Sequence, residues 1–425
     1  MEAFLLPQRG FGFRPGGGAP ACAPQSATTQ RPYQPQELKA DLRRLARRLG
    51  LAALGFVEAR RWVRLQEELA RRVQEGTYPA FCERDPALRC DPQQWLPGAR
   101  SLWVAAWPYQ PPRPAPQPAG APQGRLAAYA ICPDYHRGLR RRLEVLVRWA
   151  ARRCALRPEA HFRVLVDTGP PVERELLRLS GAGVVGKNTC AFVPQAGSWV
   201  VLGVVVSTLA LPADPEAAEP EMPPQEPAMC LNCRRCLDAC PTGALQAYRI
   251  DPARCISHLT QLRGPLPEDQ RLSLRGWVFG CDLCQLACPH NGPEQAPLAF
   301  HHPRRLRPAP ELSTRAGLAW LLGLSGEEFT RLFGPTAAAW RGRSVLQRNA
   351  AYAAAEALRR AGPGSYPELR AALAYQAENH PSPVVREACR WALNPPPRPN
   401  RRPLRPSRTP PCAGPSLPGG GTPGR

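Results

Sequence analysis

The sequence has no hydrophobic stretch long enough to cross a membrane. A transmembrane helix needs about 18 or more consecutive apolar residues, and no run in the 425 residues approaches that length. The first residues, MEAFLLPQRGFGFRPGGGAPACAPQ, also lack the cationic stretch followed by an apolar segment that marks a secretory signal. We therefore expect a cytosolic protein that does not associate with a membrane.

Acidic residues are scarce relative to basic ones. The chain has 34 Asp and Glu against 56 Lys and Arg, which gives a formal net charge of +22. A surplus of that size favours a polyanionic partner, and nucleic acid is the first candidate. Frequent arginine codons in a GC-rich genome explain the composition equally well, so charge alone does not decide.

Proline content and hydrophobic patterning divide the chain into five parts. Short apolar runs alternate with helical stretches in the first half, which indicates an α/β domain. Short alanine-rich amphipathic helices follow one another after Pro308, as in a helical repeat built from antiparallel pairs. We expect a disordered tail over residues 1–33, an α/β domain over 34–226 with an exposed proline-rich loop at 111–124, a ferredoxin-like cysteine domain over 227–305, a HEAT-like helical repeat over 306–394 and a disordered basic tail over 395–425.

Cysteine, in contrast, is abundant, with 16 residues. In a cytosolic protein such cysteines are metal ligands more often than disulfides. CLNCRRCLDACP (Cys230–Pro241) has the C-x2-C-x2-C-x3-C-P spacing of bacterial ferredoxins, and CDLCQLACP (Cys281–Pro289) follows it. Zinc ribbons use paired C-x2-C knuckles instead of three cysteines in close series. The spacing therefore predicts two iron–sulfur clusters.

The ferredoxin pattern also predicts which cysteines share a cluster. The last cysteine of each run binds the cluster of the other run. The first cluster is then held by Cys230, Cys233, Cys236 and Cys288, and the second by Cys240, Cys281, Cys284 and one further residue. Cys255 is the eighth ligand on position alone, because it is the single cysteine between the two runs.

The surroundings of these cysteines resemble the epoxyqueuosine reductase family over about residues 35 to 393. The similar segments are VDTGPPVERELLRLSGAGVVGKNT, GSW, ACPTGAL, RCISHLTQLRGP and GCDLCQLACPHN, in this order. The resemblance implies a cytosolic enzyme with cobalamin and two 4Fe-4S clusters. Such an enzyme removes the epoxide oxygen of epoxyqueuosine at the wobble position of tRNA. It further implies that the α/β domain binds cobalamin, that an external flavodoxin- or ferredoxin-like protein supplies electrons, and that the chain is a monomer.

By the same resemblance, Asp167 in the VDTGP stretch is the general acid and a cobalamin contact. The residue ends an apolar strand, and the end of a strand in an α/β sheet is where ligands bind. Without the resemblance, a turn or helix-cap aspartate is the more usual role for Asp before Gly-Pro. A carboxyl group that donates a proton near neutral pH needs a raised pKa, which we expect from burial against the corrin.

Other binding residues follow from the resemblance in the same way. It implies cobalamin contacts at Arg89, Tyr129 and Ser257 and a tRNA contact at Arg263. His136 is a possible cobalt ligand, although a lone helical histidine more often serves packing. Three further arginines at the start of the repeat could meet phosphates or form a solvated basic face: Arg341, Arg343 and Arg348.

The sequence departs from the family pattern at Val204, Leu209 and Cys190, and the stretch 71–91 matches poorly. Two other functions share some of these features. A corrinoid reductive dehalogenase uses similar cofactors, but it is expected to carry a twin-arginine signal and to lack a basic repeat. A ferredoxin-type electron carrier or corrinoid-reactivating protein explains the clusters but neither Asp167 nor the repeat.

Overall fold

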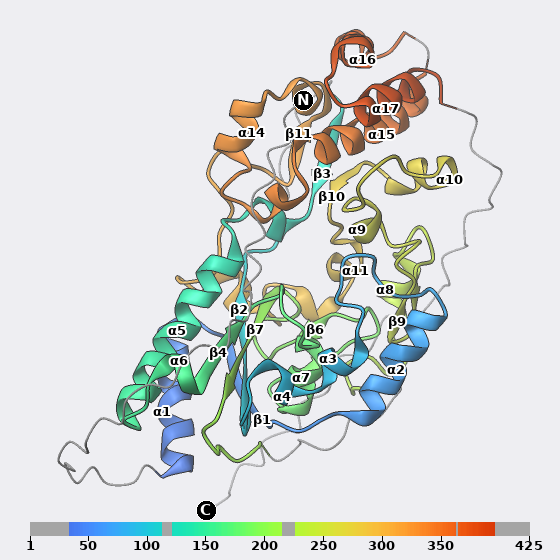
Figure 1. Cartoon of the computed structure of the whole chain (residues 1–425). Helices are drawn as coiled ribbons and strands as arrows, with labels where there is room; N and C mark the ends of the chain where they lie inside the picture. The colour runs from blue at the N-terminus through green and yellow to red at the C-terminus, as the bar shows by residue number, and fades with distance from the viewer. Residues whose placement is uncertain (1–33, 113–120, 215–225, 363, 396–425) are drawn as a thin grey trace, which may run out of the picture.

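The computed structural model describes residues 34–112, 121–214, 226–362 and 364–395 (Figure 1). The expected tails at 1–33 and 396–425 therefore lie outside the described residues. The same holds for most of the proline-rich loop, residues 113–120, and for the acidic part of the linker before Cys230, residues 215–225. The last residues of the expected loop, Gln123 and Gly124, belong to a strand.

The first half of the chain is built on a four-stranded sheet in the order β1-β2-β7-β4. The strands are β1 (Ala53–Glu58), β2 (Ser101–Pro108), β7 (Val200–Ser207) and β4 (Phe162–Leu165), and every neighbouring pair is antiparallel. β2 and β7 are central and covered on both faces, which is why their sequences are almost continuously apolar. The apolar runs therefore predicted the strands correctly.

Helices cover both faces of this sheet. On one face, α1 (Pro35–Arg48) and α5 (Tyr135–Arg153) pack against inward side chains such as Phe56, Trp103 and Val205. On the other face lie α2 (Val63–Gln74), α3 (Pro86–Cys90), α4 (Pro92–Trp95) and α7 (Glu173–Leu179), against residues such as Val104 and Val206. Alternate strand residues point to opposite faces, so each helical layer has its own apolar core.

A second, three-stranded sheet joins the two halves of the chain. β3 (Gln123–Leu126) lies between β10 (Trp277–Phe279), which is parallel to it, and β11 (Arg315–Gly317), which is antiparallel. Leu126 and Ile131 enter one hydrophobic core with residues of the cysteine region and of the C-terminal helices. The expected domain boundaries at 226 and 305 thus do not separate the apolar cores.

The cysteine region has only short elements. They are the hairpin β8 (Leu245–Gln246) and β9 (Arg249–Ile250), and the one-turn helices α8 (Arg235–Asp238), α9 (Ile256–Leu259), α10 (Glu268–Arg271) and α11 (Leu283–Leu286). The other short elements of the chain are α6 (Pro158–His161), β5 (Val184–Val185), β6 (Ala191–Phe192) and α12 (Pro297–His301), with 3₁₀ turns at 128–131, 272–274 and 289–291.

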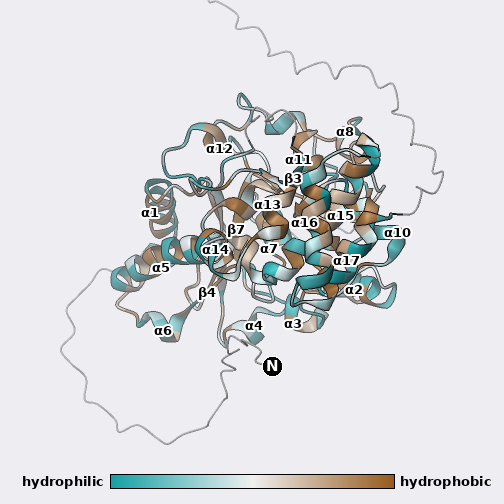
Figure 2. Cartoon of the chain, turned by 90° about the horizontal axis from the view of Figure 1, so that it is seen from above, coloured by the Kyte–Doolittle hydropathy of each residue, from teal (hydrophilic) through white to brown (hydrophobic). Residues whose placement is uncertain are grey.

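The C-terminal part is helical, as expected. It contains α13 (Leu318–Gly323), α14 (Gly326–Leu332), the 3₁₀ helix η4 (Ala337–Arg341), α15 (Arg343–Ala361), α16 (Pro367–Asn379) and α17 (Pro383–Leu393). α17 packs against both α15 and α16. Figure 2 shows hydrophobic residues gathered toward the middle of the molecule and hydrophilic ones on peripheral helices such as α6 and α10. Among the described residues, no helix is both long and apolar enough to cross a membrane.

Two buried polar residues of α15 hold the turn that follows α9. Arg348 is fully buried, and its guanidinium donates hydrogen bonds to the carbonyl oxygens of Leu262 (2.7 Å) and Gly264. The Asn349 amide donates to the carbonyl oxygens of Thr260 (2.7 Å) and Val278 (2.8 Å). Buried carbonyl groups need such partners, so α15 fixes the backbone around the second group of cysteines.

We expect Asn349→Leu to destabilise the protein by roughly 2–4 kcal/mol, because two buried carbonyl groups lose their donors. Urea unfolding followed by circular dichroism measures this change. Asn379→Leu is the matched control, since the Asn379 amide donates to the carbonyl of Tyr375 on an exposed helical surface, and its effect should stay below about 0.5 kcal/mol. Equal midpoints for the two variants would contradict the role assigned to Asn349.

Candidate active site between the sheet and the cysteine region

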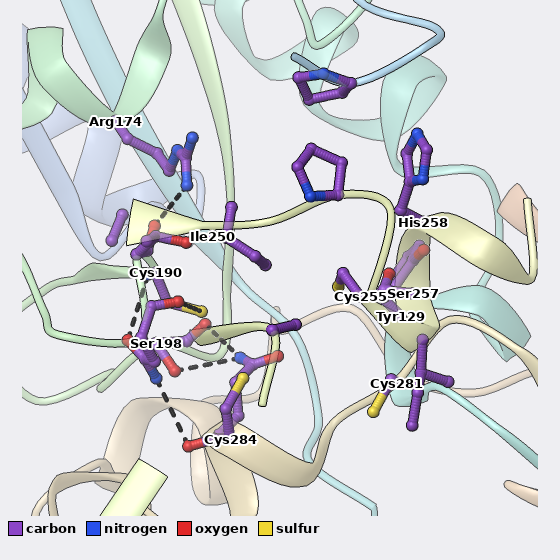
Figure 3. Close-up of a pocket in the computed structure, with 18 of the residues that line it drawn as sticks. Tyr129, Arg174, Cys190, Ser198, Ile250, Cys255, Ser257, His258, Cys281 and Cys284 are labelled. Carbon is purple, nitrogen blue, oxygen red and sulfur yellow. Dashed lines mark hydrogen bonds between the residues drawn. The ribbon is translucent and has the colours of Figure 1, made fainter. Parts of the chain in front are cut away.

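A cavity of about 500 Å³ lies between the beginning of β7 and the cysteine region. Its wall is mostly apolar, with Val200, Val201, Leu202 and Ile250 among the lining residues. In the close-up of Figure 3, Tyr129, Cys255 and Ser257 lie together on one side, and Arg174, Cys190 and Ser198 on the other. A cavity of this size with few polar groups is typical of a cofactor or small-molecule site.

Eight cysteines gather in two sets of four. Cys230, Cys233, Cys236 and Cys288 line one small cavity, although Cys288 is more than fifty residues from the others. Cys240, Cys255, Cys281 and Cys284 line the large cavity, together with Cys82 and Cys190. Cys255 thus lies in the same cavity as the other three cysteines of the predicted second set, and the assignment of ligands stays a prediction.

Several of these thiols resist ionisation. Burial, with a smaller contribution from neighbouring cysteines, raises the pKa of Cys236 and Cys288 to about 12. Burial, again with a smaller contribution from neighbouring cysteines, raises the pKa of Cys255 to about 11. Thiolates are the form that binds metal, so a cationic group is needed to keep four of them together. A four-iron cluster meets this requirement, because each thiolate binds a separate iron atom.

Residues from the sheet half hold the loops of the first set. The Lys187 ammonium donates hydrogen bonds to the carbonyl oxygens of Cys230 (3.0 Å), Leu231 and Cys233 (3.3 Å), and it pairs with the Glu226 carboxylate. The GKNT segment, which sequence reasoning left without a role, is therefore a support for the cysteine loop.

A second support fixes the loop after Cys288. The Asn291 amide donates to Ser198 Oγ (2.8 Å) and to the carbonyl of Gln285 (2.8 Å), while its oxygen accepts the Ser198 N–H (2.7 Å). Gly197 has a positive φ of 57°, and a Cβ there would lie 2.4 Å from Asn291 Oδ1. The GSW segment thus requires glycine because the cysteine region lies directly against it.

Asp167 lines the large cavity, and two neighbouring side chains contact its carboxylate. The Tyr135 hydroxyl donates to Asp167 Oδ2, and His136 Nε2 lies 3.3 Å from the same oxygen. His136 Nδ1 lies 2.7 Å from Asp134 Oδ1, so the imidazole bridges two carboxylates. Asp167 has a φ of 54° in the turn after β4 and caps no helix among the described residues. His136 contacts both carboxylates and also stacks on the Tyr135 ring, with centroids 4.1 Å apart.

The charges of this group are arranged differently from our expectation. Burial raises the pKa of Asp167, but the hydrogen bonds from His136 and Tyr135 outweigh it and leave the pKa below its usual range. Burial lowers the pKa of His136, but its bonds to Asp134 and Asp167 outweigh this and raise it to about 9. The expected rise in the Asp167 pKa depends on burial against a corrin and stays a prediction, whereas in the protein alone His136 holds the proton at neutral pH.

Glu173 is a further acidic group that the sequence did not single out. It is the first residue of α7 and lines the same cavity. Burial and the charge of Asp167 raise its pKa to about 7. Its Oε1 is buried without a hydrogen-bond partner in the described part of the chain. In the sequence, the only sign of a special role for Glu173 was an acidic residue shortly after Pro170–Pro171, at the start of a helix.

The residues expected to contact cobalamin do not all reach the cavity. Tyr129, Asp167 and Ser257 line it, whereas Arg89 does not. The Arg89 guanidinium instead donates to the carbonyl oxygens of Pro170 (3.0 Å) and Pro171 (3.3 Å) and to the Tyr78 hydroxyl. Arg89 therefore supports the loop after Asp167 from behind.

The arginines expected to meet RNA differ in exposure. Arg263 is exposed on the turn after α9. Burial of Arg341 is the main cause, and the charge of Arg263 a further one, of a lowered pKa of about 10 for the Arg341 guanidinium. Arg343 donates to the carbonyl of Leu324. Arg348 cannot meet phosphates, because it is buried and bonded to the backbone turn that carries Arg263.

Comparison with known proteins gives two family matches. Residues 229–291 match the family described as a 4Fe-4S double cluster binding domain. Residues 89–168 match the family described as Epoxyqueuosine reductase QueG, DUF1730. The two matches cover the cysteine region and the segment from Arg89 to the Asp167 loop.

Curated relatives and solved structures agree with these matches. The chain is 32% identical over 361 residues to the epoxyqueuosine reductase of Bacillus cereus, covering 84% of this chain and 89% of the relative. It is 38% identical over 322 residues to that of Burkholderia pseudomallei, covering 72% and 73%. A structure of an epoxyqueuosine reductase with a tRNA-Tyr epoxyqueuosine-modified stem loop superposes with a TM-score of 0.73 at 30% identity, over 85% of this chain and 90% of that one. The Bacillus subtilis enzyme, solved with its catalytic aspartate loop swung out of the active site, gives 0.70 at 29% identity, over 84% and 90%.

We expect the ring protons of His136 to titrate near pH 9 in nuclear magnetic resonance spectra of histidine-labelled protein. The signal is assigned by its loss in His136→Gln. Because the folded-state pKa lies above 6.5, any stability that His136 contributes is complete below pH 6.5 and disappears as pH rises through 9. Asp134→Asn should lower this pKa toward 6.5, because one carboxylate neighbour is lost.

Asp85→Asn is the control for that titration. Asp85 also accepts a backbone N–H at a helix start, but it bonds to no histidine among the described residues, so the His136 pKa should not change. A His136 signal that titrates at its ordinary pKa in the unmodified chain would contradict the bridge between the two aspartates.

Proposed function

Given that this chain belongs to the epoxyqueuosine reductase family and is an oxidoreductase of tRNA queuosine biosynthesis, we propose that it reduces epoxyqueuosine to queuosine at the wobble position of tRNA, with cobalamin and two 4Fe-4S clusters as cofactors. Removing the epoxide oxygen as water consumes two electrons and two protons. One observation carries the proposal: the wall of the large cavity contains the four cysteines of the second set together with Asp167, whose carboxylate contacts His136. Electrons and a proton can therefore reach the same space.

Each cluster is assigned to one of the two cysteine sets. Cys230, Cys233, Cys236 and Cys288 hold the first cluster, and Cys240, Cys255, Cys281 and Cys284 hold the second. The four-iron double-cluster family match over residues 229–291 supports this assignment. Since only the second set lines the large cavity, electrons from an external flavodoxin- or ferredoxin-like reductant enter at the Cys230 set and leave through the Cys255 set.

The cavity residues fit cobalamin. A corrin has broad apolar faces, and the mostly apolar wall around Val200–Leu202 and Ile250 offers matching surface. Tyr129 and Ser257 would hold the group beside Cys255, and Asp167 would lie near it, with Arg89 acting through the loop that it supports. When bound, cobalamin supplies the low-potential electrons that open the epoxide.

Asp167 and His136 together supply the proton that the departing epoxide oxygen needs. His136 is charged at neutral pH and lies within contact of Asp167 Oδ2, so it is the resting source of the proton. Asp167 faces the cavity and passes this proton from His136 to the departing oxygen as the epoxide opens. Tyr135 and Asp134 hold the two side chains in position, and an acid placed in this way typically contributes about 10²–10⁴-fold to the rate.

The tRNA partner would bind on the side of the cavity that carries Arg263. A relative has been solved with an epoxyqueuosine-modified stem loop, and the net charge of +22 favours a polyanion. The C-terminal helices α15, α16 and α17 are the HEAT-like repeat of this proposal. We also propose a monomeric cytosolic enzyme and keep 34–226, 227–305 and 306–394 as its functional divisions.

Replacing Cys255 by Ser tests the cluster assignment without turnover. We expect wild-type protein, reconstituted without oxygen, to contain about eight iron atoms per chain. Cys255→Ser should lose up to about half of them and change the electron paramagnetic resonance spectrum of one reduced cluster, because one thiolate ligand is missing. Cys154→Ser is the control: Cys154 is also half-buried but caps α5, so its iron content should equal wild type. Unchanged iron and spectra in Cys255→Ser would remove Cys255 from the ligand set.

Replacing Asp167 by Asn tests the proton donor. Anaerobic turnover of epoxyqueuosine-containing tRNA, followed by nucleoside mass spectrometry, should fall by about 10²–10⁴-fold, while iron and cobalamin contents stay at the wild-type level. The control Asp41→Asn removes a carboxylate that pairs with Arg44 on α1, and its rate should not change. Full activity in Asp167→Asn would overturn the acid assignment, and absence of queuosine with the wild type would overturn the proposed function.

A further inference from the structure

Three segments far apart in the sequence meet in one aromatic group, which we call the aromatic platform: Phe81, His258, Trp340 and Arg341. The rings of Phe81 and His258 stack with centroids 5.0 Å apart, and Trp340 meets Phe81 edge-on at 5.5 Å. The Arg341 guanidinium lies over the Trp340 ring at 3.4 Å and over Phe81 at 5.1 Å. His258 also accepts the Ala80 N–H at 3.1 Å, which ties the first two segments together.

The platform is ordered but open to solvent. Phe81 is 38% and Trp340 is 48% exposed, which sets them apart from the tryptophans of the sheet cores, such as Trp103 at 0%. Aromatic rings left in water lose the stabilisation that burial gives. Exposed aromatic side chains that are nevertheless fixed by stacking are typical of a binding surface.

The platform borders the large cavity. Phe81 and His258 are among the cavity's lining residues, and so is Gln261, whose side-chain oxygen accepts the Trp340 indole N–H at 3.1 Å. Ser257, next to His258 in the chain, also lines the cavity. A ligand that entered the cavity on this side would pass the platform.

The platform also carries positive charge. Arg341 Nε is buried without a hydrogen-bond partner in the described part of the chain. Arg263 is exposed and close enough to disfavour the charge on Arg341. Neither arginine forms an ion pair with a carboxylate among the described residues, whereas other arginines, such as Arg271 and Arg360, do. Two adjacent cations without a carboxylate favour an anionic ligand.

We propose that the aromatic platform is a stacking subsite for an unpaired nucleotide next to the epoxyqueuosine, with the base against the exposed ring of Trp340 and a phosphate facing Arg263 and Arg341. The inference rests on the proposed function, because it takes a tRNA anticodon loop as the ligand. Single-stranded RNA is bound by this combination of aromatic faces and cationic groups. The subsite would hold the neighbouring nucleotide out of the loop's own stack and so direct the wobble nucleoside into the cavity.

The test measures binding and not turnover. Full-length protein with its clusters reconstituted is titrated into a fluorescent anticodon stem-loop that carries unmodified guanosine at the wobble position. In parallel stem-loops, each loop nucleotide is replaced in turn by an abasic residue. With wild type, one abasic position beside the wobble nucleotide should weaken binding by roughly 5- to 150-fold, the range that loss of one base–aromatic stack gives.

Trp340→Ala should weaken binding of the intact stem-loop to a similar extent and should no longer respond to that abasic position. Trp340→Phe should restore most of the affinity, because it keeps an aromatic face. Arg341→Lys should weaken binding as well, since lysine keeps the charge but loses the planar group that stacks on Trp340. Trp320→Ala is the matched control: Trp320 is 40% exposed on α13 and does not line the cavity, so its affinity should equal wild type.

The outcomes separate this inference from the proposed function. If Trp340→Ala binds the intact stem-loop like wild type, or still responds to the same abasic position, the subsite is overturned even when turnover is normal. If Trp340→Ala binds RNA normally but accepts electrons from the external reductant more slowly, the platform is instead a docking surface for that protein. If the abasic response disappears as expected while wild type fails to reduce epoxyqueuosine in tRNA, the subsite stands and the proposed chemistry does not.

Discussion

The arrangement of the site depends on side chains that hydrogen-bond to the backbone of the cysteine loops. These loops have only one-turn helices and a two-residue hairpin, so they cannot satisfy their own carbonyl groups. Lys187 serves the first cysteine set, Asn291 connects the second run to the sheet, and Arg348 and Asn349 hold the turn after α9. Lys187, Arg348 and Asn349 lie outside the loops that they support, and Asn291 bonds across to Ser198 of the sheet half, so the cysteine region takes its shape from both halves of the chain.

This dependence explains how Asp167 and the second cysteine set come to line one cavity. The sheet half provides Asp167 and the apolar wall at the beginning of β7, and the cysteine region provides the opposite wall. Neither half encloses the space alone. The hydrogen bonds across the boundary, from Ser198 to Asn291 and from Lys187 to the Cys230 loop, therefore set the separation between Asp167 and the second cysteine set.

Local patterns in the sequence predicted what is local in the structure. The continuous apolar runs correctly indicated β2 and β7, and the cysteine spacing indicated two sets that the structure brings together. The network around Asp167 could not be predicted in this way, because His136 comes from α5 and meets Asp167 only when the helix packs on the sheet. Arg348 looked like a surface cation in an amphipathic helix, yet tertiary contacts bury it completely. Phe81, His258 and Trp340 carry no motif, since their spacing in the chain says nothing about their meeting.

The position of β3 has a consequence for how the protein is made. Within the described parts of the chain, this strand pairs only with β10 and β11, whose residues are synthesised about 150 to 190 positions later. While the ribosome is still translating the cysteine region, residues 123–131 have no partner, and their apolar side chains stay exposed. The sheet of β1, β2, β4 and β7 can form during translation, but the wall that contains Tyr129 forms only after β11 has emerged. The cavity, and with it a place for the cofactors, is therefore completed near the end of synthesis.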